Sequence, residues 1–141
     1  MKALLLSGVL AVAPALADDA PSPRAVVEAK FAAVNRHSVP DVVAFYAPDA
    51  QITASDFCKP RQGRADVERT YKNIFAVVPD VAVTVDEYVV QDDRVAVRFT
   101  LHGSVSGHAF DAPIQDFFTV RNGLIARDDG MFDNHGRPCA P

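Results

Sequence analysis

The spacing of hydrophobic residues changes near Val81, and this change strongly constrains what the chain can fold into. Before Val81, apolar residues recur every three to four positions, which is typical of helices. After it they alternate with polar residues, as in Val95, Val97 and Phe99, which is typical of half-buried strands. Helices followed by a run of strands predict an α+β domain. We expect N-terminal helices packed over a curved antiparallel sheet, with an apolar pocket between the two layers.

The N-terminal half carries clear helix signals. Ser22 and Pro23 are a cap and a first helical residue, and Ser38 to Asp41 form an S-x-x-D capping box. The pattern predicts helices over residues 22–37, 38–46 and 65–78, a strand over residues 51–55 and a loop over residues 57–63.

The C-terminal half reads as antiparallel strands joined by turns. We expect strands from residue 81 to a turn at 92–93, then over residues 95–101, 110–120 and 124–133, with a break at 103–107. Asn122-Gly123 predicts a tight hairpin between the last two strands.

The first residues look like a targeting segment. Lys2 precedes an apolar stretch over residues 3–13, which is too short to span a bilayer, and Ala15-Leu16-Ala17 is a cleavage signal. We therefore expect a signal peptide over residues 1–17, a linker over 18–23 and one domain over 24–141. The mature protein is expected to be exported, either periplasmic or secreted.

Export gives the two cysteines a structural meaning. Cys58 and Cys139 form the only pair, and in an oxidising compartment a disulfide between them is expected. They lack the C-x-x-C spacing of redox or zinc sites. The alternative is a pair of free, buried thiols.

Charge and motifs exclude several functions. The net charge of −4 argues against nucleic acid as a partner, because no basic stripe exists to displace counterions. The residue directly after the cleavage site is Asp18 and not a cysteine, so we expect no membrane anchor. The histidines form no metal-ligand pattern, and no motif for a serine nucleophile, dinucleotide or nucleotide phosphate is present, so we expect no metal and no cofactor.

Asp116 is the leading candidate for chemistry. It lies between Ile114 and Phe118 on an otherwise apolar strand face, where a carboxylate is costly to desolvate. We expect its carboxyl to point into the pocket as a pocket acid, with a pKa above that of a model peptide. The alternatives are a structural aspartate bonded to a helix backbone, or a strand face that is assigned wrongly by one residue.

The hairpin brings a second aspartate towards Asp116 in either of two registers. A two-residue turn at Asn122-Gly123 places Asp129 opposite Asp116, whereas a three-residue loop with a bulge places Asp128 there. Two close carboxylates share a proton more easily than they both ionise. Arg127 or Arg98 could instead neutralise one of them.

Two residues of the predicted helices carry polar side chains beside apolar ones. Tyr71 lies beside Val67 and Phe75, so its hydroxyl needs a partner if it is buried, although simple core packing is the alternative. Lys30 lies beside Phe31, and we expect it to extend outward to solvent.

The mature chain resembles the SnoaL-like branch of the nuclear transport factor 2-like superfamily, to which the ketosteroid isomerases are related. The matching stretches are residues 31–35, 45–50, 63–67, 79–81, 93–99 and 122–125. The resemblance implies a cone-shaped domain with a deep apolar pocket, often a dimer, and it implies that the first and last strands run side by side in parallel, which would bring Cys58 near Cys139. A homodimer through the outer sheet face, where Arg98, Thr100 and His102 lie, is expected on the same basis.

The ketosteroid isomerases are the nearest catalytic comparison. Asp116 matches the aspartate that they keep protonated as an oxyanion-hole donor, an example already known for that family. Tyr71 matches a supporting tyrosine. Lys30 stands in place of their main donor tyrosine, and Ala54 in place of their general base, with Asp56 two residues on.

From these features we expect binding of a small, largely apolar molecule, with Phe31, Ala54, Phe75, Phe99 and Phe118 as its contacts. Acid–base processing of the isomerase, cyclase or hydrolase type by Asp116, Asp128 and Tyr71 is the accompanying hypothesis. One alternative is a non-catalytic ligand- or partner-binding domain, and another is a structural dimerisation module.

Overall fold

A computed structural model of the chain describes residues 20–139, so the expected signal peptide and the first linker residues lie outside the described part. Ser22 and Pro23 are not linker: they cap and begin the first helix. The elements are α1 (Pro23–Asn35), α2 (Val39–Ala44), β1 (Tyr46–Ala54), β2 (Arg61–Gln62), α3 (Arg64–Val77), β3 (Ala82–Gln91), β4 (Arg94–Val105), β5 (His108–Arg121) and β6 (Leu124–Met131).

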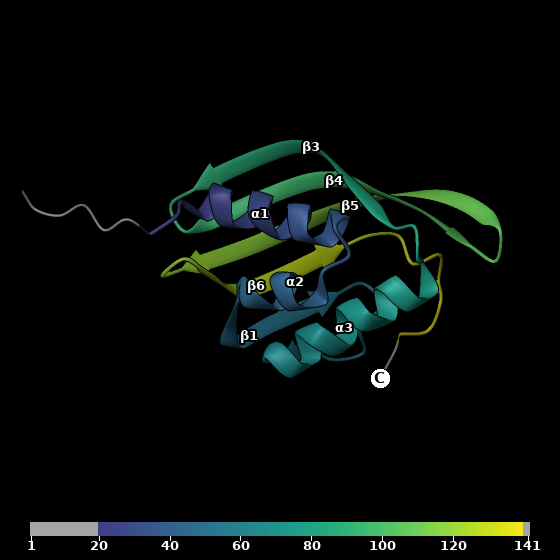
Figure 1. Cartoon of the computed structure of the whole chain (residues 1–141), viewed down its shortest axis with the longest axis horizontal. Helices are drawn as coiled ribbons and strands as arrows, with labels where there is room; N and C mark the ends of the chain where they lie inside the picture. The colour runs from purple at the N-terminus through teal and green to yellow at the C-terminus, as the bar shows by residue number, and fades with distance from the viewer. Residues whose placement is uncertain (1–19, 140–141) are drawn as a thin grey trace, which may run out of the picture.

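The strands form one curved sheet in the order β2-β1-β6-β5-β4-β3, and the three helices lie over one of its faces (Figure 1). All neighbouring strands are antiparallel except β1 and β6, which are parallel. The α+β prediction is confirmed, with the refinement that the sheet is mixed. The parallel pair agrees with what the family resemblance implied.

The predicted helix starts are confirmed by their caps. The Ser22 side chain accepts a hydrogen bond from the backbone amide of Ala25, and Ser38 accepts one from Asp41. The second helix is shorter than expected, because it ends at Ala44 and the chain enters β1 at Tyr46. Tyr46 is therefore a buried strand residue rather than the end of a helix.

The predicted break at residues 103–107 is wrong in part, because β4 continues to Val105. Gly103 is needed for close packing: a Cβ there would lie 2.2 Å from Cγ1 of Val78. The turn itself comes later, at Ser106 and Gly107, which both have positive φ angles.

The β5–β6 hairpin contains a bulge that the sequence analysis did not foresee. Arg121 pairs with Leu124, as a two-residue turn requires, but Thr119 pairs with Arg127 and leaves Ala126 as an extra residue. Asp116 consequently faces Gly130, so both predicted registers are wrong at that point. The same shift turns Asp128 towards the helices and Asp129 away from them, because strand residues alternate between faces.

The disulfide prediction is confirmed. Cys58 and Cys139 are bonded, with their Cα atoms 4.9 Å apart and 81 positions apart in sequence. Each cysteine lies beyond the end of one strand of the parallel β1–β6 pair. Closing a loop of this length stabilises the fold by about 4–5 kcal/mol in the chain-entropy account.

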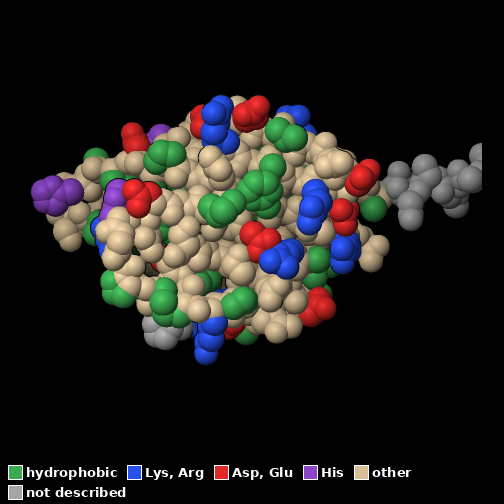
Figure 2. Space-filling model, turned by 180° about the vertical axis from the view of Figure 1, so that it is seen from behind, with side chains coloured by type: hydrophobic (Ala, Val, Ile, Leu, Met, Phe, Trp, Pro, Cys, Tyr) green, Lys and Arg blue, Asp and Glu red, His purple; other side chains and the backbone are tan. Residues whose placement is uncertain are grey.

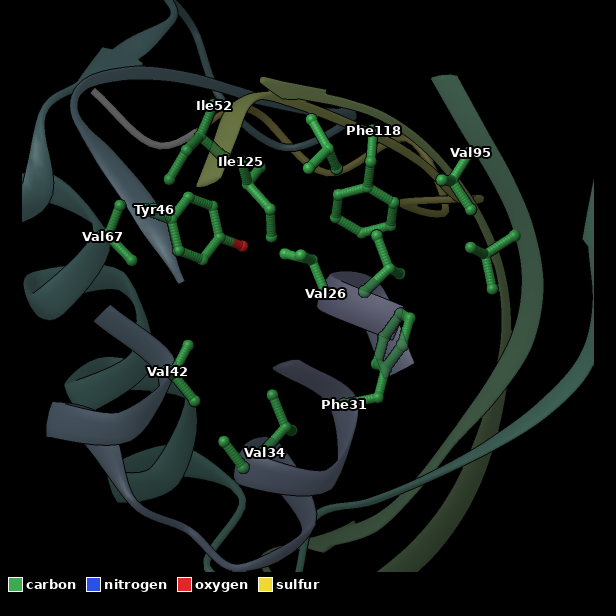
Figure 3. Packing of buried hydrophobic residues seen from close by; sticks show 14 of the residues in the cluster. Val26, Phe31, Val34, Val42, Tyr46, Ile52, Val67, Val95, Phe118 and Ile125 are labelled. Carbon is green, nitrogen blue, oxygen red and sulfur yellow. The ribbon is translucent and has the colours of Figure 1, made fainter. Parts of the chain in front are cut away.

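The core lies between the three helices and the concave face of the sheet (Figure 3). Phe31 points from α1 towards the curved strands, and its ring meets those of Phe99 and Phe118 at centroid distances of 4.9 and 6.0 Å. Asn35, near the end of α1, exchanges two hydrogen bonds with the backbone of Val83 on edge strand β3. These contacts hold α1 across the sheet and fix the position of its inward side chains.

The opposite sheet face is mixed in character, with charged and apolar side chains interspersed (Figure 2). Arg98 pairs with Glu87, and Arg127 pairs with Asp129. Val89, Phe117 and Met131 are exposed. No helix within residues 20–139 has the length and apolar character needed to cross a bilayer.

Candidate functional site

A cavity of about 520 Å³ lies between the helices and the concave face of the sheet. Its volume is in the range of small-molecule sites. Most of its wall is apolar, and includes Phe31, Phe99, Leu101 and Ile114. The expected apolar pocket is therefore present.

Polar side chains from five elements meet at one part of this wall. They are Lys30 from α1, Tyr46 from β1, Tyr71 from α3, Asp116 from β5 and Asp128 from β6, and all five are buried. Lys30, Tyr71, Asp116 and Asp128 line the cavity. We call these five residues the buried polar cluster.

Lys30 points inward, which contradicts the expectation that it extends to solvent. It is 3% exposed, and its ammonium nitrogen lies 4.2 Å from the ring centroid of Phe31 and 4.9 Å from that of Phe118. Burial by itself lowers the pKa of Lys30, but attraction to Tyr71, Asp128 and Asp116 outweighs it and raises the pKa above its ordinary value. Lys30 is therefore a cation at neutral pH.

The inward direction of Lys30 has a local reason. Val26 and Ala33 lie one turn before and after it on the same buried side of α1. The rings of Phe31 and Phe118 cover the ammonium and favour its charge through cation–π attraction. The i, i+4 spacing from Val26 was visible in the sequence, but the covering ring of Phe118 comes from a distant strand.

Asp116 lines the cavity and is 7% exposed, as the sequence analysis expected. Its neighbour across the hairpin is Gly130, where a Cβ would lie only 2.7 Å from Oδ1 of Asp116. Gly130 thus provides the space for the carboxyl. Burial, and then repulsion from Asp128, raise the pKa of Asp116 to about 7, although Lys30 acts in the opposite direction. The predicted rise in pKa is confirmed.

Asp128 differs from Asp116 in having a strong hydrogen-bond partner. The Tyr46 hydroxyl donates to its carboxylate at 2.5 Å, and the Tyr46 oxygen lies 3.4 Å from that of Tyr71. Burial raises the pKa of Asp128, while Lys30 and the Tyr46 hydrogen bond favour its ionised form. When the two aspartates share one proton, these contacts favour placing it on Asp116 and leaving the charge on Asp128.

The expected ligand contacts divide into two groups. Phe31, Ala54 and Phe99 line the cavity. Phe118 is fully buried beneath Lys30 and Phe31, and Phe75 packs against Tyr71 at 6.1 Å. These last two are not among the residues that line the cavity, but each contacts residues that do.

Tyr71 belongs to the buried polar cluster, so it is more than a core residue. Its hydroxyl meets that of Tyr46, a residue which the sequence analysis did not select because it placed Tyr46 at the end of a helix. Burial raises the pKa of Tyr71, so it stays a neutral hydroxyl.

Residues from the β1–β2 connection and from β2 itself contribute to another part of the cavity wall. Asp56, Phe57 and Arg61 line it, and the Arg61 guanidinium lies 3.6 Å from the ring centroid of Phe57. Cys58 in this connection ties it to the C-terminal segment. Within residues 20–139, no group of three or more potential metal ligands comes together.

Comparison with known proteins places this geometry in context. Residues 27–128 match the SnoaL-like domain family. A search of curated protein sequences finds no match.

Several solved structures share the fold. The chain is similar to IdmH, a putative polyketide cyclase from Streptomyces antibioticus, with a TM-score of 0.73 and 23% identity over 80% of this chain and 93% of that one. It is similar to TerC, co-crystallised with polyporic acid, with a TM-score of 0.73 and 18% identity over 80% and 92%. A hypothetical protein with a ketosteroid isomerase-like fold from Catenulispora acidiphila, in complex with trimethylamine, has a TM-score of 0.70 and 20% identity over 78% and 85%.

Proposed function

This chain belongs to the SnoaL-like domain family, and from that premise we propose that it binds a small, largely apolar molecule in its cavity and processes it by acid–base chemistry at Asp116. One observation carries the proposal. Asp116 lines an apolar cavity, and burial and the nearby charges raise its pKa to about 7. Within the described residues, no hydrogen-bond donor contributes to this pKa.

A carboxyl with this pKa is suited to general acid–base catalysis. Near neutral pH both of its protonation states are populated, so it can donate a proton to a ligand oxygen and later take one back. Asp128 holds the neighbouring negative charge through its hydrogen bond from Tyr46. The cyclase relative and the polyporic acid complex are consistent with an apolar ligand that carries oxygen.

Binding is tested by a thermal-shift screen of small apolar carbonyl compounds against the wild type, Asp116→Asn and Asp129→Asn. Asp129 is the matched control, since it lies on the outer face of the same hairpin. We expect ligands that raise the melting temperature of the wild type and of Asp129→Asn but act less on Asp116→Asn. A screen in which no apolar compound shifts the wild type would contradict the proposal.

Catalysis is tested by NMR in D₂O with the ligands that the screen identifies. We expect the wild type to exchange the protons next to the ligand carbonyl, and Asp116→Asn to lose about 10²-fold or more of that rate, the usual contribution of a general acid–base group. Exchange that is equal in both proteins would remove Asp116 from the mechanism.

A non-catalytic binding domain is the second candidate, and Ala54 favours it. Ala54 lines the cavity where ketosteroid isomerases carry their general base, so a second catalytic carboxylate is missing from that position. Ligands that bind equally well to the wild type and Asp116→Asn, without proton exchange, would support this function instead.

We also propose that the protein works after export. The disulfide is compatible with an oxidising compartment. Mass spectrometry of protein recovered from that compartment should give an N-terminus at Asp18, and an intact Met1 would contradict the proposal.

A further inference from the structure

Lys30 is the charged member of the buried polar cluster to which the proposed function gives no role. Its ammonium lines the cavity, and the ion pairs within residues 20–139 do not include it. Neither Asp116 nor Asp128 therefore lies within 4.0 Å of it. A buried cation that faces a cavity without a direct carboxylate partner is a ready site for a ligand anion.

The aromatic rings around Lys30 argue against a cationic ligand at this position. The ammonium already lies over Phe31, Phe118 and Tyr71, at 4.2, 4.9 and 5.6 Å from the ring centroids. These ring faces are what would attract an amine. A second cation here would meet the positive charge of Lys30 instead.

The other charged and titratable groups near Lys30 can be named element by element. Tyr71 acts on it from α3, Asp116 from β5 and Asp128 from β6, and Tyr46 from β1 contacts Tyr71 and Asp128 behind them. Asp56 and Arg61 also line the cavity. Asp129, on the outer face of β6, raises the pKa of Asp116 by repulsion. With Lys30 charged, Asp128 ionised and Asp116 protonated, the cluster is neutral overall.

We infer that the Lys30 ammonium is the anchor for a carboxylate on the ligand, so that the molecule bound in this cavity is an apolar organic acid whose arrival is accompanied by protonation of Asp116. The inference rests on the proposed function and names its ligand class. At a pH where Asp116 is ionised, the ligand carboxylate replaces the negative charge that Asp116 loses when it is protonated, so the net charge around Lys30 does not change. The proton that Asp116 gains comes from solvent, and no covalent bond forms or breaks in the ligand.

The cavity fits the rest of such a molecule. Apolar side chains such as Phe99, Leu101 and Ile114 line the wall beyond the cluster, and the volume of about 520 Å³ holds a body of one or two rings. Burying that body supplies binding free energy, and the carboxylate fixes its orientation at Lys30.

The proton linkage gives this binding a characteristic pH dependence. Below the Asp116 pKa of about 7 the carboxyl already carries its proton, and the anion binds without proton uptake. Above it, each anion bound requires one proton, so the affinity should fall by up to about tenfold per pH unit. A neutral ligand that needs no protonated Asp116 shows no such fall.

The test compares 2-naphthoate with two probes of similar shape, the neutral 2-naphthamide and the cationic 2-naphthylmethylamine, by calorimetry near pH 6. We expect the acid to bind the wild type about tenfold or more tightly than the amide, and the amine to bind most weakly. In Lys30→Met the acid should lose that advantage while the amide still binds. Equal affinities of acid and amide for the wild type, or preference for the amine, would overturn the inference.

Two further variants locate the anchor. Asp116→Asn should keep the preference for the acid but remove its pH dependence, because no carboxyl is left to protonate. Arg61→Gln is the control for the second cation that lines the cavity, and it should leave the preference unchanged. If Arg61→Gln abolishes the preference instead, the anion binds at the β1–β2 connection and the inference is wrong.

Wild-type measurements keep the test decisive if Lys30→Met does not fold. Calorimetry near pH 8 in two buffers of different ionisation enthalpy should reveal uptake of about one proton per 2-naphthoate and none for the amide. Absence of proton uptake would overturn the inference and leave the proposed function standing. If none of the three probes binds, and the apolar screen also fails, the proposed function fails with it.

Discussion

Asp128 and Asp129 are neighbours in β6, yet they lie on opposite faces of the sheet and the pKa values of their carboxyls move in opposite directions. Burial against the helices raises the pKa of Asp128, against the opposing effects of Lys30 and Tyr46. Partial burial would also raise the pKa of Asp129, but hydrogen bonds from Arg127 and Thr53 outweigh it and lower the pKa. The same residue type therefore has a different charge balance on each face, because the neighbours differ.

The concave and outer faces of the sheet give a carboxyl group different surroundings. On the outer face, a carboxylate contacts water and a nearby guanidinium, so its ionised form is stabilised. On the concave face, two carboxylates and one ammonium share a desolvated space, and the protonation of each depends on the others. The predictions below test whether this coupling is confined to the concave face.

The largest difference in stability is expected when the cation on each face of the sheet is removed. At pH 8, Lys30→Met should lower the free energy of unfolding by about 3–5 kcal/mol, since it leaves a buried carboxylate without its balancing charge. Arg127→Met, its counterpart on the outer face, should change stability little, because the Arg127 side chain is half exposed. Urea unfolding measures both. The loss in Lys30→Met should shrink near pH 5, below the Asp116 pKa of about 7, where the Asp116 carboxyl carries its proton. A loss independent of pH would contradict the coupling.

The next effect concerns Asp116 and pH. Its pKa rises from 3.8 in the unfolded chain to about 7 in the folded one, so the folded state binds the proton more tightly. Stability should therefore fall as pH rises from about 4 to about 7, with a total change of about 2–4 kcal/mol from this group. Asp116→Asn should remove that fall and match or exceed the wild type in stability at neutral pH. Melting temperatures across this range, with an NMR titration of the Asp116 carboxyl carbon, check it.

The contribution of Asp129 to stability should depend on pH in the opposite direction. Because its pKa is lowered, its contribution to stability is present above the ordinary carboxyl pKa and is lost as pH falls through the lowered value. Asp129→Asn should therefore leave the fall in stability above about pH 4 unchanged. If Asp129→Asn removed it, the two faces would not be independent.

A smaller difference is expected for the hydroxyl donor on each face. Tyr46→Phe removes the hydrogen bond to Asp128 and should cost about 1.5–3 kcal/mol, as for a buried bond to a charged group. Thr53→Val removes the bond to Asp129 on the outer face and should cost about 1 kcal/mol or less, since water can replace it. Equal losses in chemical denaturation would mean that burial does not separate the two faces.

The smallest expected effect on the fold concerns the outer face as a dimer interface. Val89, Phe117 and Met131 are exposed there among charged side chains, and we predict that a second copy covers them. Light scattering at high protein concentration should give a dimer mass, and Phe117→Asp should reduce it to that of a monomer while leaving the melting temperature of the monomer nearly unchanged. A monomer mass for the wild type would reject the interface.

Much of the fold followed from local patterns in the sequence. Capping residues such as Ser22 and Ser38 set helix starts, alternation set the strands after Val81, and Asn122-Gly123 set the hairpin turn. Each of these signals acts within a few residues, which is why it can be read without the rest of the chain. The single pair of cysteines left one possible disulfide.

The same kind of pattern identified Asp116 and its raised pKa, because alternation alone placed it on an apolar face. The residues that surround Asp116 in the fold were harder to predict. The bulge at Ala126, which brings Asp128 rather than Asp129 to the concave face, depends on how β6 pairs with β5 and β1 at once. No local signal at Ala126 marks it.

The direction of the Lys30 side chain could not be predicted from the sequence. The local pattern places Lys30 one turn from Val26 on α1, but a lysine at such a position can extend to solvent or turn inward. Its inward direction comes from the folded chain, which places the ring of Phe118 and the charges of Asp116 and Asp128 around the ammonium. The energy of a buried charge depends on groups that are distant in sequence and close in space, so the direction of Lys30 is fixed only once the sheet has formed.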